Sequence, residues 1–150
     1  MKKRVATSSG GPQIAPRRLG LELLEARCLL SAQPIITEFV ASNDTTLNDG
    51  FGDDSDWLEI YNAGDLPVNL QGYHLTDNAA NPTKWAFTAE TILNPKEYLL
   101  VFASGDDTID PEGYWHTGFR FSAGGEFVGL ADPSGVMISS FGAAGEDYPP

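Results

Sequence analysis

The sequence predicts an all-β sandwich, and three observations lead to this prediction. Sixteen glycines and ten prolines in 150 residues favour many turns over long helices. The apolar content of 41%, with 11% aromatic residues, is enough for a hydrophobic core and too high for a disordered chain. From residue 34 onward, short apolar segments recur between turn signals, which is the pattern of two packed sheets.

The first 33 residues are predicted to be a leader in front of a single domain at 34–150. Residues 1–18 are small, polar and basic, and we expect them to be flexible. In the segment that follows, apolar residues recur at helical spacing. A secretory signal needs a continuous apolar stretch, and here Glu22 and Glu25 interrupt it. We therefore expect a flexible or short-helical leader.

The domain begins with a strand at 34–40, in which the period of two puts Ile36 and Val40 on one face and Phe39 on the other. Later strands are expected at 57–61, 68–70, 73–75, 85–87, 98–103, 119–121, 126–131 and 136–138. A bulge or a bend is expected at Gly72. The segment 98–103 is apolar on both faces, which indicates a buried central strand.

Seven pieces of the domain resemble the lamin-tail domain, a family found in nuclear lamins and in bacterial surface proteins. In family order they are residues 36–43, 56–62, 68–77, 84–87, 98–105, 116–119 and 125–130. The resemblance implies an immunoglobulin-like β-sandwich that serves as an interaction module and is not similar to an enzyme. Bacterial members continue into another short strand where this chain ends in Tyr-Pro-Pro, so we expect a fragment.

The leader contains LEARCLLSA at residues 24–32. It resembles the element L-E-x-R-x-L-L-S-A that opens many large exported bacterial proteins. This resemblance implies a secreted or cell-surface bacterial protein in which the domain is joined to others. The only cysteine, Cys28, lies in this element, so the domain can form no internal disulfide. No apolar run reaches the ~18 residues that a membrane helix needs.

The charge of the domain argues against nucleic acid as a partner. Six of the nine basic residues precede residue 28, and the part from residue 33 onward carries nineteen acids against three bases, a net charge of −16. Nucleic-acid affinity depends on Lys and Arg side chains that neutralise phosphates. A protein or a cell-surface polysaccharide is therefore the expected partner, and cations also remain open.

Four aspartates crowd into the eight residues that precede the second strand. They are Asp49, Asp53, Asp54 and Asp56. Together with Asn43, Asp44 and Ser55, they could supply the roughly six to eight oxygen ligands of calcium. Their spacing differs from that of helix–loop–helix calcium sites, and exposed acidic clusters are also ordinary solvated surfaces. We favour a solvated turn, in which Asp56 bonds to backbone N–H groups, and keep calcium as the alternative.

Two aromatic residues are candidates for ligand binding. Tyr114 and Trp115 follow a polar loop, and Trp115 is the tryptophan expected to be most exposed, whereas Trp57 and Trp85 lie in patterned strands and are expected in the core. Exposed aromatic rings stack on sugars. Carbohydrate binding, assisted by calcium, is therefore the alternative function to a plain interaction or spacer module.

No pattern of catalytic residues is apparent. The sequence contains no G-x-S-x-G, no H-E-x-x-H and no phosphate-binding loop. His74 and His116 are 42 residues apart, and neither has a nucleophile beside it in the sequence. Isolated histidines in strands are more often packing residues than ligands or bases. We therefore expect no enzymatic activity and no cofactor other than the calcium considered above.

Overall fold

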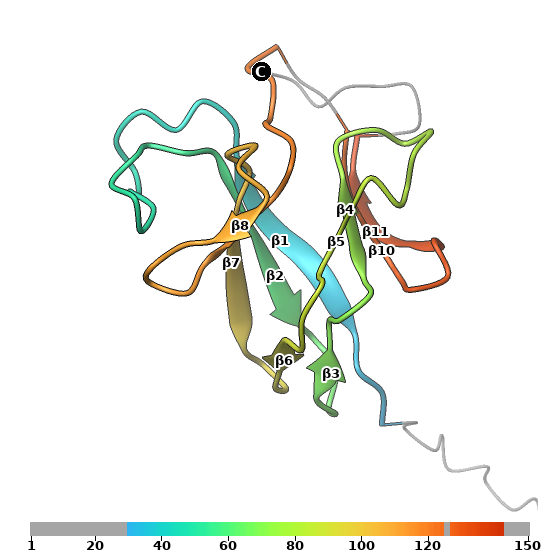
Figure 1. Ribbon diagram of the computed structural model, residues 1–150. Helices are drawn as coiled ribbons and strands as arrows, with labels where there is room; N and C mark the ends of the chain where they lie inside the picture. The colour runs from blue at the N-terminus through green and yellow to red at the C-terminus, as the bar shows by residue number, and fades with distance from the viewer. Residues whose placement is uncertain (1–29, 125–126, 143–150) are drawn as a thin grey trace, which may run out of the picture.

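Figure 1 shows the computed structural model of the chain, which describes residues 30–124 and 127–142. Within these residues the secondary structure is built of β-strands and contains no helix. The strands are β1 (Pro34–Val40), β2 (Trp57–Asn62), β3 (Val68–Asn69), β4 (His74–Thr76), β5 (Trp85–Ala86), β6 (Ile92–Leu93), β7 (Tyr98–Phe102), β8 (Thr108–Ile109), β9 (Trp115–His116), β10 (Val128–Ala131) and β11 (Met137–Phe141). The predicted all-β class is confirmed.

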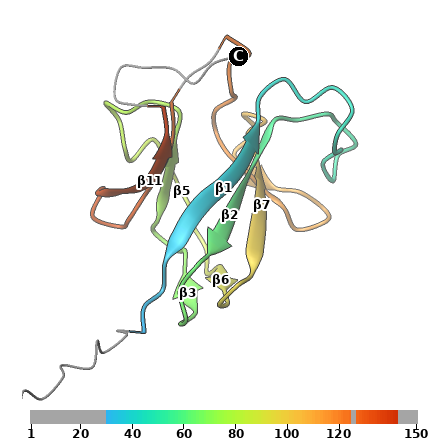
Figure 2. The same ribbon diagram turned by 180° about the vertical axis from the view of Figure 1, so that it is seen from behind.

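Two sheets face each other across the core (Figure 1). One has the strand order β1-β2-β7-β9-β8 and the other the order β11-β10-β4-β5. A two-stranded sheet of β3 and β6 covers one end, where β1 begins (Figures 1 and 2). The strands pair in antiparallel fashion, except that β9 runs parallel to β7. This is the predicted immunoglobulin-like sandwich.

Apolar side chains from both sheets fill the space between them. The fully buried ones include Leu58, Ile60, Leu75, Val101, Val128 and Leu130. Beside them Trp85, Phe87 and Trp115 form an aromatic group with ring-centroid distances of 4.9, 5.8 and 5.5 Å. Each buried side chain of this size contributes roughly 1.5–3 kcal/mol, so this core dominates the stabilisation of the fold.

Side-chain hydrogen bonds connect the two sheets at their edges. On one side, the backbone N–H of Ile36 in β1 donates to Ser139 Oγ of β11 at 3.0 Å. On the other side, Trp85 Nε1 of β5 donates to Asp107 Oδ1, next to β8, at 2.7 Å. Figure 2 shows β1 and β11 on the first of these sides. These bonds provide partners for polar groups at the sheet edges, which would stay unpaired in an open sandwich.

A bulge in β1 changes which side chains face the core. Ile36 pairs with Ile60, but the next pair is Glu38 with Glu59, so Thr37 is an extra residue. Because the bulge shifts the alternation by one, Phe39 packs against the core together with Ile36. The predicted opposition of Ile36 and Phe39 is therefore wrong. Of the bulge or bend predicted at Gly72, the structure shows a bend: the φ of Gly72 is 83°, and Tyr73 N donates to Leu70 O at 2.9 Å.

Other predicted elements differ in detail. The expected strand 119–121 is reduced to a bridge between Ser104 and Arg120, and β6, β8 and β9 were not predicted. The central strand β7 is buried at Phe102, but Tyr98 at its start is 61% exposed. The first residue of the expected strand 126–131 lies outside the described residues.

The first 29 residues, and with them the predicted flexible or helical leader, also lie outside the described residues, as do residues 143–150. Residues 31–33, which we assigned to the leader, bond to the turn that follows β2. Asp65 N donates to Ser31 O, Ala63 N to Gln33 O, and Gln33 N to Asn62 Oδ1. The domain therefore begins before β1.

Candidate functional site

The acidic loop between β1 and β2 is held in shape by Asp49. This residue is 5% exposed. Its Oδ1 accepts hydrogen bonds from the N–H groups of Phe51 and Asp53, both at 3.0 Å, and its Oδ2 accepts one from Ser55 Oγ at 2.7 Å. Burial alone would raise the pKa of Asp49, but these hydrogen bonds outweigh it and hold the pKa below its ordinary value.

Asn43 and Asp56 close the base of the same loop. Asn43 is buried, and its Nδ2 donates to Leu47 O at 2.6 Å and to Ser55 O at 3.0 Å. Asp56 Oδ1 accepts a hydrogen bond from the N–H of Asn43 at 3.0 Å. The loop therefore satisfies its own buried polar groups, and Asp56 bonds to backbone as the solvated-turn interpretation requires.

A buried line of three side chains attaches this loop to the five-stranded sheet. His116 Nε2 lies 3.1 Å from Asp110 Oδ2, and His116 Nδ1 lies 2.8 Å from Ser104 Oγ. A carboxylate only accepts, so in the neutral ring Nε2 carries the hydrogen and Nδ1 accepts from the Ser104 hydroxyl. Asp110 Oδ2 also accepts from the N–H of Gly50 at 2.8 Å, which brings the acidic loop to this line.

Asp110 accepts two further bonds, from the N–H groups of Glu112 and Tyr114, both at 2.9 Å. Burial would raise its pKa, but the bonds from His116 and from the three backbone N–H groups hold the pKa of Asp110 below its ordinary value. The loop approaches so closely that a Cβ on Gly50 would lie 2.5 Å from Asp110 Cγ. Only glycine fits there.

The imidazole of His116 is enclosed by two phenylalanine rings. Phe102 stacks on it with a centroid distance of 5.3 Å and an interplanar angle of 27°, and Phe51 of the acidic loop covers it at 5.3 Å. The side chain of His116 is 0% exposed. Serine, histidine and aspartate in hydrogen-bonded order also form the triad of serine hydrolases. Here His116 is buried and cannot contact a second reactant, and Ser104 Oγ already accepts a hydrogen bond from Asp106 N at 3.2 Å.

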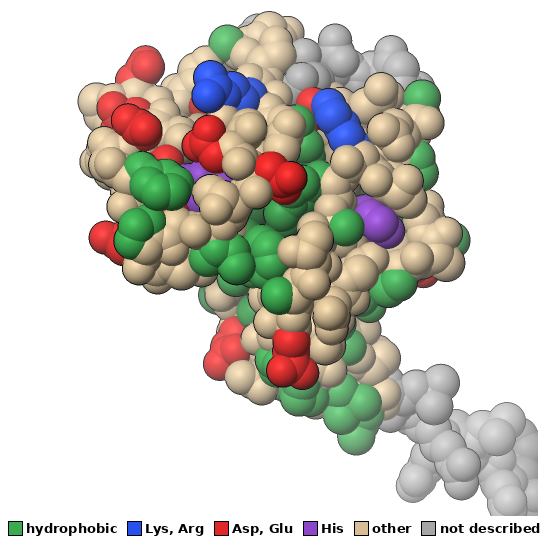
Figure 3. Space-filling model, in the orientation of Figure 1, with side chains coloured by type: hydrophobic (Ala, Val, Ile, Leu, Met, Phe, Trp, Pro, Cys, Tyr) green, Lys and Arg blue, Asp and Glu red, His purple; other side chains and the backbone are tan. Residues whose placement is uncertain are grey.

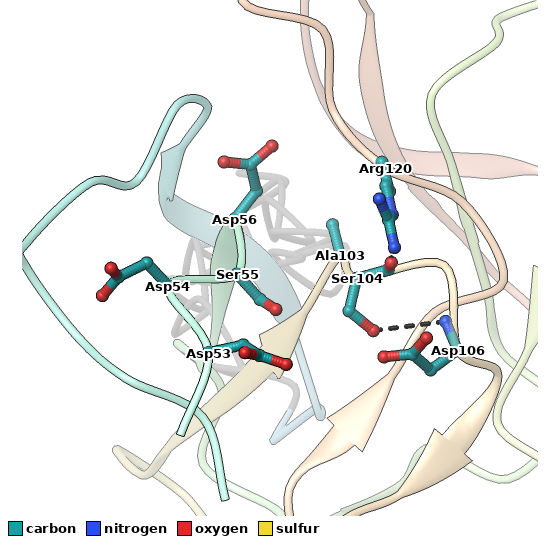
Figure 4. Close-up of a pocket in the computed structure, with 8 residues that line it drawn as sticks. All are labelled: Asp53, Asp54, Ser55, Asp56, Ala103, Ser104, Asp106 and Arg120. Atoms are coloured by element: carbon teal, nitrogen blue, oxygen red, sulfur yellow. Dashed lines mark hydrogen bonds between the residues drawn. The ribbon is translucent and has the colours of Figure 1, made fainter. Parts of the chain in front are cut away.

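A cavity of about 370 Å³ opens beside this line, between the acidic loop and the chain that follows β7 (Figure 4). Its lining consists of Asp53, Asp54, Ser55, Asp56, Ala103, Ser104, Asp106 and Arg120. Arg120 Nε donates to the backbone oxygen of Ser104. None of the three ion pairs between described residues involves the four aspartates of the lining. The cavity therefore carries an excess of negative charge.

Two apolar side chains are exposed near the line of Ser104, His116 and Asp110. Phe51 is 51% and Ile109 is 47% exposed, and they flank the bond between Gly50 and Asp110. Figure 3 shows exposed apolar side chains on this face, close to a histidine and surrounded by acids. We call the surface formed by Phe51, Ile109 and the acidic cavity lining the acidic face.

The predicted calcium ligands are separated by the fold. Asp53, Asp54 and Asp56 line the cavity, whereas Asp49 is buried in the loop and engaged by backbone. Among the described residues, no three His, Cys, Asp or Glu side chains are grouped as they would be around a metal ion. Calcium binding stays a prediction, for which an experiment is given below.

The expected exposure of Trp115 is wrong. Trp115 is 8% exposed, because its position in β9 points its ring between the sheets, where it meets Trp85 and Phe87. Its neighbour Tyr114 is half-buried, with its ring edge-on to Phe102 at 5.5 Å. Trp57 and Trp85 are buried as predicted. A ligand-binding role of Tyr114 and Trp115 stays a prediction, although Trp115 offers no free ring face.

Sequence reasoning missed the line from Ser104 to Asp110. Ser104 and His116 are twelve residues apart, and they meet because β9 pairs in parallel with β7. Parallel pairing of two such short segments leaves no periodic signal. The one sign of this contact in the sequence was Gly50. Glycine is required there by the close approach of Asp110 and not by a turn.

The described residues contain no helix of the length and apolar character that would cross a bilayer. No curated protein matches the chain. The family model described as Lamin Tail Domain matches residues 31–145. The match covers most of the 150 residues and begins at the residues that bond to the turn after β2. The chain therefore belongs to the lamin-tail domain family.

Proposed function

We propose that this chain is a non-catalytic interaction module that binds a positively charged segment of a partner protein through the acidic face. The observation that carries this proposal is that the hydrogen-bonded loop exposes Phe51 near four aspartates that form no ion pair with a described residue. An aromatic anchor next to unpaired charge is the composition of a binding hot spot with a polar rim.

The physical basis is electrostatic attraction followed by local contact. The domain carries a net charge of −16 from residue 33 onward, so basic partners are attracted over a Debye length of ~8–10 Å. The bonds of Asp49 and Asp110 hold the loop in one conformation. Little entropy is then lost when a partner binds, because the surface is already ordered.

The same geometry supports the absence of catalysis. A hydrolase needs its histidine to reach the leaving group and needs donors for the developing oxyanion. His116 is 0% exposed, and the cavity that Ser104 lines has four aspartates against one arginine. Negative charge at that position disfavours an oxyanion. We therefore assign the line of Ser104, His116 and Asp110 to the support of the loop.

We further propose that the protein is a secreted or cell-surface protein of a bacterium, in which this domain is joined to others. The support is the element at residues 24–32, which resembles those of exported proteins. Fractionation of cells that express the full chain tests this proposal. Recovery of the protein in the cytoplasmic fraction alone would contradict it.

The binding proposal is tested by titrating the isotope-labelled full chain with a synthetic peptide that alternates lysine and leucine. We expect amide shifts in residues 49–56 and 104–110, and a Kd that rises at least tenfold between ~50 and ~200 mM salt. The double variant Asp53→Asn/Asp54→Asn should weaken binding several-fold. Glu90→Gln, which removes an exposed acid remote from the cavity lining, is the matched control. Equal loss in both variants would refute a local site.

A further inference from the structure

A second cavity of about 260 Å³ lies at the other end of β1 from the acidic face. Its lining comes from three separate parts of the chain: Ala32, Gln33, Pro34 and Ile35 at the domain entry, Tyr73 before β4, and Asp132 and Ile138 around the β10–β11 turn. The register of β4 and β10 ends at His74 with Ala131, so Tyr73 and Asp132 are opposite each other one position further. The fold therefore places a phenol and a carboxylate in one cavity.

The carboxylate of Asp132 is fixed in place. Its Oδ1 accepts hydrogen bonds from Ser134 N at 2.9 Å, Ser134 Oγ at 2.6 Å and Val136 N at 3.0 Å. The bonds from Ser134 and Val136 hold the pKa of Asp132 below its ordinary value, so the group is ionised near neutral pH. No described residue donates to Oδ2, which leaves one oxygen of a preorganised acceptor free.

The hydroxyl of Tyr73 is also free of partners among the described residues. Partial burial, together with the charge of Asp132, raises the pKa of Tyr73, so the phenol keeps its proton and can donate. The ring itself packs partly against the core. A donor and an acceptor in fixed positions are thus set among the aliphatic side chains of Pro34, Ile35 and Ile138.

We propose that this cavity is a binding site for one sugar unit of a neutral saccharide. A pyranose presents hydroxyl groups that both donate and accept, alternating with C–H surfaces. The free Asp132 Oδ2 would accept from one hydroxyl, the Tyr73 hydroxyl would donate to another, and the aliphatic walls would meet the C–H surface. The cavity is smaller than the ~300–1,000 Å³ of sites for drug-sized ligands, which suits a single ring.

This inference goes beyond the proposed function, because it uses another cavity and another chemistry. The acidic face offers four carboxylates and no free hydroxyl donor of this kind, and it suits cations. The Tyr73–Asp132 cavity offers one carboxylate with half of its oxygens already engaged. A single carboxylate that has one oxygen already hydrogen-bonded and lies beside a phenol favours a neutral hydroxylated ligand over a strongly cationic one.

The test uses the isotope-labelled full chain and four disaccharides: maltose, cellobiose, mannobiose and N,N′-diacetylchitobiose. At least one should shift the amides of Gln33, Tyr73 and Asp132, with a Kd in the ~1–10 mM range of a small, preformed polar site. Absence of saturable shifts with all four at several times that concentration would overturn the proposal.

Two variants locate the binding. Tyr73→Phe removes only a hydroxyl that has no hydrogen-bond partner among the described residues, so folding should be unchanged while the Kd rises about fivefold. Asp132→Asn keeps an Oδ1 acceptor for the turn and replaces the free oxygen by a donor, and the Kd should rise about tenfold or more. Tyr98→Phe, at an exposed tyrosine outside the cavity lining, is the matched control, and an equal effect in it would refute the location.

The outcome is separable from that of the acidic face. The double variant Asp53→Asn/Asp54→Asn should leave disaccharide binding unchanged, and Tyr73→Phe should leave binding of the lysine–leucine peptide unchanged. A parallel titration with Nα-acetyl-lysine amide examines the competing ligand class. If that compound saturates the cavity while the disaccharides do not, the site is a cation site and the saccharide proposal is wrong.

Discussion

Removal of the Asp110 side chain should destabilise the domain far more than removal of the Asp106 side chain, which lies in the same segment. Asp110 accepts four hydrogen bonds, from His116, Gly50, Glu112 and Tyr114. Asp110→Ala leaves each of these donors without its acceptor. Each loss costs ~1 kcal/mol after partial rehydration, so we expect a loss of ~4 kcal/mol from a total stability of ~5–15 kcal/mol.

Asp106→Ala is the matched control. Asp106 carries the same charge in the same segment, but its carboxylate forms no hydrogen bond with a described residue. Its loss should change the free energy of unfolding by no more than ~0.5 kcal/mol. Urea denaturation of both variants of this chain measures the difference, and a fall of ~4 kcal/mol corresponds to a Tm lower by ~15 °C.

Hydrogen exchange locates the effect. The N–H of Gly50 points at Asp110 Oδ2, so it should be protected in the wild type and exchange quickly in Asp110→Ala, ahead of the core strands. If Asp110→Ala loses no more stability than Asp106→Ala, the line from Ser104 to Asp110 does not support the acidic loop. The assignment of His116 to a structural role would then have to be abandoned.

Three further predictions follow from the same geometry. The folded-state pKa values of Asp49 and Asp110 lie below their ordinary values. Their contribution to the free energy of unfolding is therefore complete above ~pH 5 and declines as the pH falls below ~4. Urea titrations at several pH values should show this decline, and Asp110→Ala should make it smaller. Trp115→Ala should cost ~3–5 kcal/mol in urea denaturation, because the ring fills the core beside Trp85; a near-neutral result would show that the ring lies outside the core. Calcium binding predicts a higher Tm in calcium than in chelator, whereas equal values would leave Asp53, Asp54 and Asp56 as a solvated acidic surface.

The fold class was within reach of the sequence because it depends on local alternation and turn chemistry. The pattern of β2, with Leu58 and Ile60 inside and Glu59 between them, is buried as the period of two requires. The bend at Gly72 follows from the φ of 83° that glycine adopts readily. The charge of the domain follows from composition alone. None of these properties requires knowledge of which segments meet.

Features that depend on distant segments were decided by the tertiary structure alone. The bulge at Thr37 exchanges the faces of β1, since one inserted residue shifts an alternation of period two. Trp115 is buried because β9 pairs with β7, and the same pairing brings His116 to Ser104. Likewise, Asp56 and Asp110 accept hydrogen bonds from the N–H groups of Asn43 and Gly50, which lie 13 and 60 residues away in the sequence. Composition determined how much acid the surface carries, and tertiary contacts determined which of these carboxylates bond to distant backbone, because a hydrogen bond depends on distances in space that residue spacing does not encode.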